Sequence, residues 1–359
     1  MKILTVIATM GTGGAEAIVT ALVTEADSRV EHACVASAGG WRSELLAGAG
    51  VEQLPVPLGT RSLRDLRSAV LRLRSWIGEH APDVIHAHNV KATAVAALAR
   101  GRSAAPIVTT LHGLSGYAAA ARVLARCSDV VVAVSEHVAG ELSARGYPAA
   151  RLRVIENAIP PLPVHDRGRA RRRLGVQDAS RVVVSLARFA PQKRHDLLID
   201  AWRAVRPDAM LLLAGDGPTR VDVERSVVAA GLERRVRLLG ERQDPDWLFA
   251  AADLAVLATD WEGLPVSLLE AMSVGVPVLA SRVGGVAEGL AGAACLVEPG
   301  SAAALASGLN SLLDDAAARA ELAARGRALV ADRFDPRRML AAYRQLYEGV
   351  FGSDLGSTR

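Results

Sequence analysis

Short runs rich in Val, Ile and Leu alternate along this chain with longer amphipathic segments, and the pattern occurs twice. In the first half the apolar runs lie at 2–8, 32–37, 83–88, 106–112, 129–135 and 152–157. In the second half they lie at 181–188, 209–215, 236–240, 254–259 and 277–281. Apolar strands separated by helices are typical of a parallel sheet covered by helices on both faces. We therefore predict an α/β protein with two doubly wound, Rossmann-like domains in tandem.

The length of 359 residues agrees with two domains, because it is about twice that of a typical single domain. Between the two sets of strands, residues 158–175 contain three prolines and five arginines without apolar periodicity, which indicates an interdomain connection. We expect an N-terminal domain over 1–162, a linker over 163–178 and a C-terminal domain over 179–335. Ligands of such sheets bind at the carboxyl ends of the strands, so we expect a site in the cleft between two facing domains.

The composition excludes several other classes of protein. Half of the residues are hydrophobic and 22% are charged, which is the balance of a folded chain. The three cysteines are widely separated, which predicts a reduced, cytoplasmic protein without disulfides or a zinc cluster. No apolar run reaches the roughly 18 residues of a membrane-spanning helix, and we interpret the N-terminal run as a buried strand. A net charge of +4 with 4% aromatic residues disfavours a nucleic-acid partner.

A glycine-rich turn follows the first strand, with Gly11, Gly13 and Gly14 ahead of a helix. Glycines there let backbone N–H groups approach an anion, which the positive end of the helix dipole also favours. Glu16 takes the place of the third glycine of a dinucleotide motif, so a dehydrogenase is disfavoured. A tight turn that binds no ligand remains the alternative interpretation.

Two cations stand at the start of a helix in the second half of the chain. Arg188 ends a strand, and Lys193 follows five residues later, just before the helix. Cations are unfavourable at the positive end of a helix unless they bind an anion there. A diphosphate fits, since Arg supplies a fork of donors and Lys a point charge. Two solvated surface cations remain the alternative, and Asp216 in the nearby GDGP segment is compatible with a plain turn.

Two glutamates flank the start of a later apolar helix. Pro265 suits the first turn of that helix, which leaves Glu262 in the preceding loop and Glu270 about 7–8 Å along the axis. The first backbone N–H groups of the helix should point out of its end: those of Leu264, Val266 and Ser267. Carboxylates accept hydrogen bonds from hydroxyls but are repelled by phosphate. A nucleotide sugar, with hydroxyls on both sides of a diphosphate, satisfies both conditions.

Other conspicuous residues have plainer interpretations. Asp244 and Asp246 form a D-x-D before a helix, where N-capping is favoured over metal binding. His86 and His88 share one face of a strand, but without a third ligand we expect packing instead of a metal site. A basic helix is a possible contact for an anionic membrane, although a solvated face is favoured; it carries Arg61, Arg64, Arg67, Arg72 and Arg74 beside an apolar stripe of Leu63, Leu66, Val70, Leu73 and Ile77.

Taken in order, eight motifs resemble those of the retaining glycosyltransferase family 4, which has the GT-B fold. They are the GGAE turn at 13–16, PDVIHAH at 82–88, TLHG at 110–113, AVSE at 133–136, Arg188 with Gln192 and Lys193, LAGDGP at 213–218, Glu262 and Glu270 with seven residues between them, and GVPVLASRVGGVAE at 275–288. The resemblance covers residues 1 to about 350. It implies two Rossmann-like domains that face each other across a cleft, and a last helix, within 336–359, that crosses back to the first domain.

The resemblance also implies roles for individual residues. Arg188 and Lys193 would hold the donor diphosphate, Glu270 the ribose hydroxyls, and Glu262 a hydroxyl of the transferred sugar. The backbone of Gly263, Leu264, Pro265 and Val266 would meet phosphate and sugar, and Gly240 to Arg242 the base. From the first domain, Gly14 would contact the diphosphate and His112 the sugar.

The implied reaction is front-face transfer without metal or cofactor, giving an alpha-glycoside, with His112, Arg188, Lys193 and Glu262 as catalytic residues. We expect UDP-GlcNAc or UDP-glucose as donor, and a lipid-linked sugar, a cyclitol or an antibiotic scaffold as acceptor. A nucleotide-sugar epimerase, a phosphorylase and a non-catalytic nucleotide-sugar-binding protein are alternatives. The phosphorylase lacks a visible context for a cofactor-bearing lysine.

Two segments depart from the family's pattern. The usual NGID or NGVD reads Asn157-Ala158-Ile159-Pro160, which loses the glycine and the acid and puts the local hinge in doubt. The usual QKG reads Gln192-Lys193-Arg194, and we expect this arginine to add a cation near the phosphates.

Overall fold

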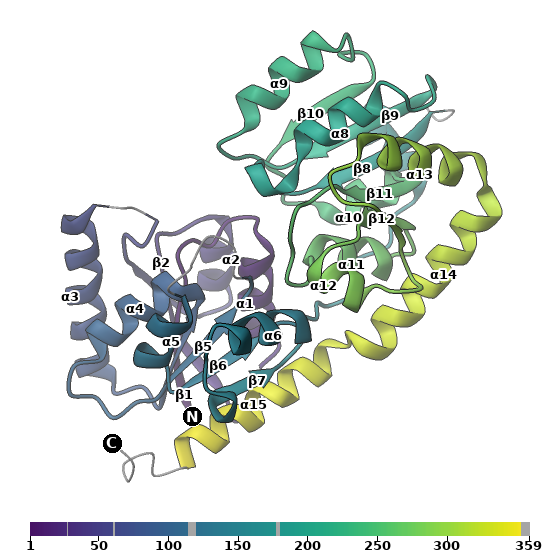
Figure 1. Ribbon diagram of the computed structural model, residues 1–359. Coiled ribbons are helices and arrows are strands. Elements are labelled where there is room, and N and C mark those ends of the chain that lie inside the picture. The colour runs from purple at the N-terminus through teal and green to yellow at the C-terminus, as the bar shows by residue number, and fades with distance from the viewer. Residues whose placement is uncertain (27, 60–61, 114–119, 177–179, 353–359) are drawn as a thin grey trace. The chain divides into compact units, whose positions relative to one another are not determined.

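The computed structural model describes residues 1–26, 28–59, 62–113, 120–176 and 180–352, and it divides into two compact units. Unit 1 comprises Met1–Asn157 and Pro336–Arg359, and unit 2 comprises Ala158–Asp335. The division falls within the segment that departs from the NGID pattern, and Asn157, Ala158 and Ile159 are all buried. Each unit contains one parallel sheet covered by helices (Figure 1). The two-domain, Rossmann-like α/β fold predicted from the sequence is therefore confirmed.

Unit 1 contains a seven-stranded parallel sheet in the order β3-β2-β1-β4-β5-β6-β7. Its strands are β1 (Lys2–Val6), β2 (Glu31–Ser37), β3 (Glu52–Pro55), β4 (Val84–His88), β5 (Ile107–Leu111), β6 (Val130–Ala133) and β7 (Leu152–Val154). Strand β3 was missed from the sequence, because its residues EQLP contain a single large apolar side chain. It lies at the edge of the sheet, where only one neighbour covers it.

Helices cover both faces of the sheet of unit 1. They are α1 (Gly14–Thr24), α2 (Trp41–Gly48), α3 (Leu63–His80), α4 (Asn89–Arg100), α5 (Ala120–Cys127), α6 (Glu136–Ala144) and α15 (Pro336–Gly352). Successive residues of β2 belong to different apolar clusters on the two faces of the sheet. Cys34 packs with α3 and α4, whereas Val35 packs with α1 and α2. This is the period of two that a strand buried on both faces requires.

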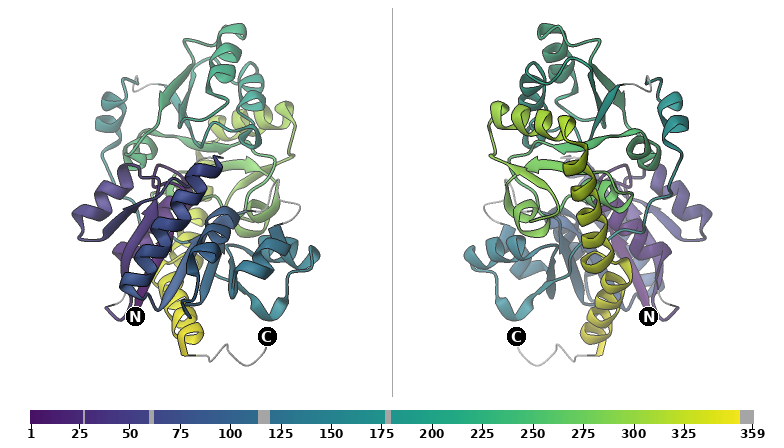
Figure 2. Two further views of the ribbon diagram at one scale, coloured as in Figure 1. Left: turned by 90° about the vertical axis from the view of Figure 1, so that its left-hand side faces the viewer. Right: turned by 90° about the vertical axis from the view of Figure 1, so that its right-hand side faces the viewer.

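The C-terminal helix α15 belongs to unit 1 and lies against its sheet (Figure 2). Its buried residues Met339, Tyr343 and Tyr347 recur every four positions, which places them on one face of the helix. The Tyr343 hydroxyl lies 2.8 Å from Thr110 Oγ1, and the Tyr347 hydroxyl lies 2.8 Å from His86 Nδ1. Two buried hydrogen bonds therefore fasten the end of the chain to β4 and β5.

Unit 2 contains a six-stranded parallel sheet in the order β10-β9-β8-β11-β12-β13. Its strands are β8 (Arg181–Leu186), β9 (Ala209–Ala214), β10 (Val236–Gly240), β11 (Leu254–Leu257), β12 (Val278–Ser281) and β13 (Cys295–Val297). The short edge strand β13 was also missed. The helices are α7 (Arg167–Arg173), α8 (His195–Trp202), α9 (Arg220–Ala229), α10 (Pro245–Ala251), α11 (Val266–Ser273), α12 (Gly284–Gly289), α13 (Ala302–Asp314) and α14 (Ala316–Arg333).

The segment expected to be a plain linker contains helix α7. Asp166 caps its N-terminus by accepting a hydrogen bond of 2.7 Å from the Arg169 amide. Arg171, only 2% exposed, pairs with Asp253 at 2.8 Å, and Asp253 also accepts from the Val182 amide. The arginines that indicated an interdomain connection are thus partly structural, because Arg171 is buried in unit 2 with a carboxylate partner.

The strand order reverses once in each sheet. In unit 1 the chain moves outward in both directions from β1 and β4, and in unit 2 from β8 and β11. The carboxyl ends of such neighbouring strands diverge into loops that run to opposite faces, which leaves a crevice where ligands bind in open α/β sheets. The loops after β1, β4, β8 and β11 are therefore the places to look for a site.

Candidate functional site

Three segments at the carboxyl edge of unit 2 are tied together by Thr259. Its amide donates to Ser281 Oγ at 3.1 Å, and its hydroxyl donates to the carbonyl of Gln192 at 2.9 Å. The Asp260 amide also donates to the Gln192 carbonyl at 2.9 Å. These bonds connect the loops after β8 and β11 to the last residue of β12. Sequence reasoning gave no role to either hydroxyl: Thr259 lies outside the eight motifs, and Ser281 lies within the motif at 275–288 but was not singled out there.

The loop after β8 carries Lys193, and the loop after β11 carries Glu262. The Lys193 ammonium donates to Glu262 Oε1, and their side chains are 17% and 11% exposed. Thr259 Oγ1 also lies 3.3 Å from the same carboxylate oxygen. The structure thus brings together Lys193, expected to bind the diphosphate of the donor, and Glu262, expected to bind a hydroxyl of its sugar. The pair lies where β8 and β11 adjoin, at the switch point of the sheet.

Arg188 lies in the same loop and is exposed. Among the residues that the structure describes, none forms an ion pair with its guanidinium. The Phe189 amide donates to the Asp216 carbonyl at 2.9 Å, so the loop rests on the GDGP segment after β9. A Cβ at Gly215 would lie 2.0 Å from the Ala187 carbonyl oxygen, and one at Gly217 would lie 2.3 Å from that of Phe189. The segment interpreted as a plain turn is a close-packed support for Arg188.

Helix α11 begins at Val266, one residue later than predicted, with Pro265 as its N-cap. The cap makes no side-chain hydrogen bond, so the helix does not satisfy its own first N–H groups. The Glu262 carbonyl accepts a hydrogen bond of 3.1 Å from the Gly285 amide, which anchors the loop to α12. Glu270 lies on α11 and is only 8% exposed. Gly263 and Leu264, between the two glutamates, are buried.

The segment assigned to a base lies at the end of β10. Gly240 has a φ of 69°, and its carbonyl accepts from the Gly215 amide at 2.7 Å. Arg242 forms a two-pronged pair with Asp244, with Nε–Oδ1 and Nη2–Oδ2 distances of 2.8 and 2.7 Å. Asp244 stands at the N-cap of α10 without a side-chain capping bond, and Asp246 bonds to His165. The N-capping interpretation of these two aspartates is therefore wrong, because the Asp244 carboxylate pairs with arginine and the Asp246 carboxylate bonds to the His165 ring.

Arg194 does not add an unpaired cation beside Lys193, as the sequence led us to expect. Its guanidinium pairs with Asp196 at 3.1 Å and with Asp260 at 3.0 Å. Hydrogen bonds to Asp196 and Asp260 raise the pKa of Arg194 above its ordinary value. The residue has a φ of 38°, a left-handed conformation that glycine adopts more easily. The two carboxylates offset its charge at the position where the related pattern has glycine.

In unit 1, Gly14 is the first residue of α1 and is exposed. Glu16 folds back over this end of the helix, where Thr9 Oγ1 donates to Glu16 Oε1 at 2.8 Å. A Cβ at Gly13 would lie 2.1 Å from the other carboxylate oxygen, so a larger residue there would require the Glu16 side chain to move. The glycine-rich turn therefore accommodates an acidic side chain of the protein at the positive end of the helix.

Three histidines gather where β4 and β5 end. His86 Nε2 lies 2.8 Å from Thr110 Oγ1, and His88 Nδ1 lies 3.1 Å from His112 Nε2. Burial lowers the pKa of His112 to about 4 and those of His86 and His88 well below their ordinary values. Among the described residues no group of three or more His, Cys, Asp or Glu side chains is placed to hold a metal ion.

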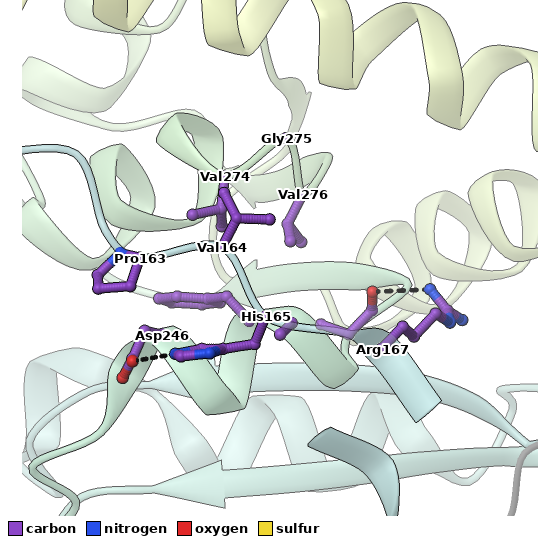
Figure 3. Close-up of a pocket in the computed structure, with 11 residues that line it drawn as sticks. Pro163, Val164, His165, Arg167, Asp246, Val274, Gly275 and Val276 are labelled. Atoms are coloured by element: carbon purple, nitrogen blue, oxygen red, sulfur yellow. Dashed lines mark hydrogen bonds and ion pairs between the residues drawn. The ribbon is translucent and has the colours of Figure 1, made fainter. Parts of the chain in front are cut away.

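A cavity of about 180 Å³ lies at the opposite, amino edge of the sheet of unit 2. It is lined by the segment before α7, by α10 and by the turn after α11. The His165 ring points toward Asp246, and His165 Nε2 lies 2.5 Å from Asp246 Oδ2 (Figure 3). None of the predicted site residues lines this cavity. It is therefore separate from the switch point.

The basic helix predicted near residue 61 is α3, which begins at Leu63. Arg61 lies outside the described residues. Its buried side chains are Ala69, Leu73, Trp76 and Ile77, whereas Leu63, expected in the buried stripe, is 83% exposed at the first position of the helix. Arg72 and Arg74 donate to the carbonyls of Pro55 and Leu98. Across residues 1–352, within the described ranges, no helix is both long and apolar enough to cross a bilayer.

Two family models match the chain in succession. Residues 12–161 match the model described as "Glycosyltransferase Family 4", and residues 166–329 match the one described as "Glycosyl transferases group 1". The first match covers the loops with Gly14 and His112, and the second covers those with Arg188, Lys193, Glu262 and Glu270.

Several characterised proteins resemble the chain over most of its length. The N-acetyl-alpha-D-glucosaminyl L-malate synthase of Bacillus anthracis is 28% identical over 291 residues, covering 76% of each chain. A GDP-mannose-dependent phosphatidylinositol monomannoside mannosyltransferase of Corynebacterium glutamicum is 29% identical over 306 residues, covering 77% of this chain and 76% of its own. The crystal structure of Anabaena HepE in complex with UDP-glucose is 26% identical with a TM-score of 0.86, covering 97% of this chain and all of HepE.

Proposed function

Because the chain is a glycosyltransferase of the group 1 and family 4 type with the GT-B fold, we propose that it is a retaining hexosyltransferase. It transfers a hexose or N-acetylhexosamine from a nucleotide sugar to an acceptor hydroxyl and gives an alpha-glycoside. The observation that carries this proposal is the Lys193–Glu262 pair at the switch point of unit 2, beside the exposed Arg188. A cationic and an anionic group in one place match a ligand that has both phosphates and hydroxyls.

In this proposal the residues of unit 2 bind the donor. Arg188 and Lys193 contact the diphosphate, while the start of α11 adds backbone N–H groups. Glu262 accepts a hydrogen bond from a hydroxyl of the transferred sugar, and Glu270 from the ribose hydroxyls. The segment from Gly240 to Arg242 contacts the base, and Gly263, Leu264, Pro265 and Val266 border phosphate and sugar. From unit 1, Gly14 contacts the diphosphate and His112 the sugar.

Front-face substitution agrees with the charges at this site. The acceptor oxygen forms its bond to the anomeric carbon on the face from which the diphosphate leaves, and the acceptor proton moves to a diphosphate oxygen. No enzyme carboxylate forms a covalent intermediate. The negative charge that develops on the leaving diphosphate is stabilised by Arg188, Lys193 and the start of α11, and such preorganised groups lower the barrier without reorganisation.

UDP-glucose and UDP-GlcNAc are the donors that we favour. HepE, 26% identical, was crystallised with UDP-glucose, and the name of the B. anthracis relative specifies an N-acetylglucosaminyl product. The C. glutamicum relative is named as GDP-mannose-dependent, so GDP-mannose is the competing donor. A lipid-linked sugar, a cyclitol or an antibiotic scaffold is the acceptor.

The experiment that tests the function is incubation with UDP-glucose, UDP-GlcNAc and GDP-mannose, with and without candidate acceptors. We expect release of the nucleoside diphosphate from one donor, faster with an acceptor, and an alpha-configured product by proton NMR. Conversion of the donor into an isomeric nucleotide sugar would indicate an epimerase. Binding without turnover across the whole acceptor panel would indicate a non-catalytic binding protein. A beta-configured product would refute retention.

A membrane surface is a further partner that helix α3 supports. Leu63 and Leu71 are 83% and 54% exposed, and Arg64 and Arg67 are exposed near them. An amphipathic surface of this kind binds anionic lipid through apolar burial and charge. Sedimentation with anionic vesicles at physiological salt tests the contact. The pair of substitutions Arg64→Glu and Arg67→Glu should abolish binding, whereas equal binding by this variant would exclude α3.

A further inference from the structure

We propose that His88 is a positioning residue: it holds His112 as the tautomer with its proton on Nδ1, so that His112 meets the substrate as a neutral hydrogen-bond donor. The inference rests on the proposed function, because it names the atom and the proton through which His112 contacts the sugar. A base in the same position would need a bare nitrogen facing the substrate. The two possibilities can be separated by the location of a single proton.

His112 is fixed in two places by the residues at the junction of β4 and α4. Its Nε2 lies 3.1 Å from Nδ1 of His88, and the two rings are nearly parallel at 18°. Its amide donates to Asn89 Oδ1 at 3.2 Å. Asn89 itself has a φ of 69°, which asparagine tolerates better than most residues. With Nε2 bonded to His88, Nδ1 is the ring nitrogen of His112 that remains for a ligand.

The ring of His88 is held in turn by His86. The two ring centroids are 4.3 Å apart, and both nitrogens of His86 have partners: Tyr347 on Nδ1 and Thr110 on Nε2, each at 2.8 Å. Helix α15 and strand β5 therefore fix His86, and His86 packs on His88. This support explains why a helix from the end of the chain bears on the geometry of His112.

One proton occupies the contact between His88 and His112. Burial lowers the pKa of His112 to about 4 and that of His88 well below its ordinary value, so both rings are neutral at pH 7. A neutral imidazole has one N–H and one bare nitrogen. Either His88 donates from Nδ1 and His112 carries its proton on Nδ1, or His112 donates from Nε2 and His88 carries its proton on Nε2.

The surroundings of His88 Nε2, the ring nitrogen that does not face His112, decide between these arrangements. His88 is 1% exposed, and no residue that the structure describes hydrogen-bonds its Nε2. In the second arrangement this nitrogen would bear a buried N–H without an acceptor, which folded proteins avoid most strongly. In the first arrangement it is a bare acceptor beside the His86 ring. The first arrangement leaves His112 with a proton on Nδ1.

Nitrogen-15 NMR of the full chain with labelled histidine tests the tautomer directly and needs no substrate. We expect a protonated Nδ1 and a bare Nε2 on His112, identified by the signals lost in His112→Asn. In His88→Phe the His112 signals should shift toward a mixture of tautomers. His195→Phe is the matched control, because it removes a buried histidine of unit 2 that stacks on Phe189, outside the His86–His88–His112 contacts, and it should leave the His112 signals unchanged. A protonated Nε2 on His112 in the wild type, or unchanged signals in His88→Phe, would overturn the inference.

Turnover of the nucleotide sugar supplies a second readout. An asparagine amide places its nitrogen near Nδ1 of the histidine it replaces, whereas a glutamine amide places it near Nε2. His112→Asn should therefore retain at least tenfold more kcat/KM than His112→Gln, and the reverse order would contradict the inference. If the wild type transfers no sugar while NMR shows the Nδ1 tautomer, the proposed function fails and the assignment of the proton stands.

Discussion

The ammonium of Lys193 donates a hydrogen bond to the carboxylate of Glu262, although the two residues are 69 positions apart in the sequence. The pair lies at the switch point of unit 2, and each side chain is less than one-fifth exposed. A donor diphosphate and a sugar hydroxyl would compete with this pair for its two members. Binding of a nucleotide sugar therefore requires the ammonium to turn toward phosphate while the carboxylate accepts from a hydroxyl.

Replacement of Lys193 tests the role of this charge. Lys193→Ala should lower kcat at least a hundredfold, since loss of one preorganised group on developing charge raises a barrier by about 3 kcal/mol. Thermal unfolding should remain cooperative. Arg203→Ala is a matched control, because this cation lies in the same unit and is 59% exposed. A wild-type rate for Lys193→Ala, measured by release of nucleoside diphosphate, would remove Lys193 from the site.

The two glutamates should separate donor binding into two parts. Glu270→Gln should weaken both UDP and UDP-sugar by roughly 10- to 100-fold, since hydrogen bonds to a charged group contribute about 1.5–3 kcal/mol each. Glu262→Gln should weaken the UDP-sugar but not UDP, because it loses a sugar contact and frees Lys193 for phosphate. Isothermal titration with both ligands measures the difference. If Glu262→Gln weakened the binding of UDP as much as that of the UDP-sugar, as Glu270→Gln should, the assignment of Glu262 to the sugar would be contradicted.

Close packing makes the GDGP segment sensitive to a single methyl group. Gly215→Ala would place a Cβ 2.0 Å from the Ala187 carbonyl oxygen, at a φ of 137°. We expect it to reduce the free energy of unfolding by more than about 2 kcal/mol and to displace the loop that carries Arg188. Gly231→Ala is the control, because its φ is 65° with nothing within 4 Å, and it should cost about 1 kcal/mol. Similar losses in urea unfolding would show that packing at Gly215 is unimportant.

A buried histidine should make stability fall in acid. His195 is 2% exposed and stacks on Phe189 at 4.3 Å, and burial with the nearby charge of Lys193 lowers the pKa of His195 to about 4. The unfolded chain binds the proton below about pH 6.5 and the folded chain only below about 4, so stability is lost as pH falls through this window. His195→Phe should reduce the slope of the free energy of unfolding there by up to about 1.4 kcal/mol per pH unit. Parallel curves for wild type and variant would contradict this.

The buried ion pair at the start of β11 should hold α7 in place. Asp253→Ala removes the carboxylate that pairs with Arg171, whose side chain is buried at 2% exposure. Removal of one member of a buried pair typically costs about 3–5 kcal/mol. Asp200→Ala, in an exposed pair of the same unit, should change stability by less than about 0.5 kcal/mol. Equal midpoints of chemical unfolding for the two variants would refute the structural role of Asp253.

The sequence predicted the parts of the fold that produce strong local patterns. Apolar strands such as β4 and β8 are evident, whereas the edge strand β3 has a single large apolar side chain and the edge strand β13, although apolar, is only three residues long. Arg188, Lys193 and Glu262 could be singled out as candidates because charged side chains are unusual at those positions. The contacts of these side chains could not be predicted, because no local pattern shows that Lys193 pairs with Glu262 or that Arg194 pairs with Asp260. Likewise the capping rule for Asp244 and Asp246 failed because side chains distant in the sequence, Arg173 and His165, bind those carboxylates.

A crystal structure with bound UDP tests the central claim most directly. We predict that the diphosphate lies at the switch point of unit 2, with Lys193 Nζ and the Arg188 guanidinium in hydrogen-bond contact with phosphate oxygens and Lys193 no longer bonded to Glu262. Density for UDP elsewhere, with Lys193 still paired to Glu262 or with both cations turned away from the phosphates, would contradict the account.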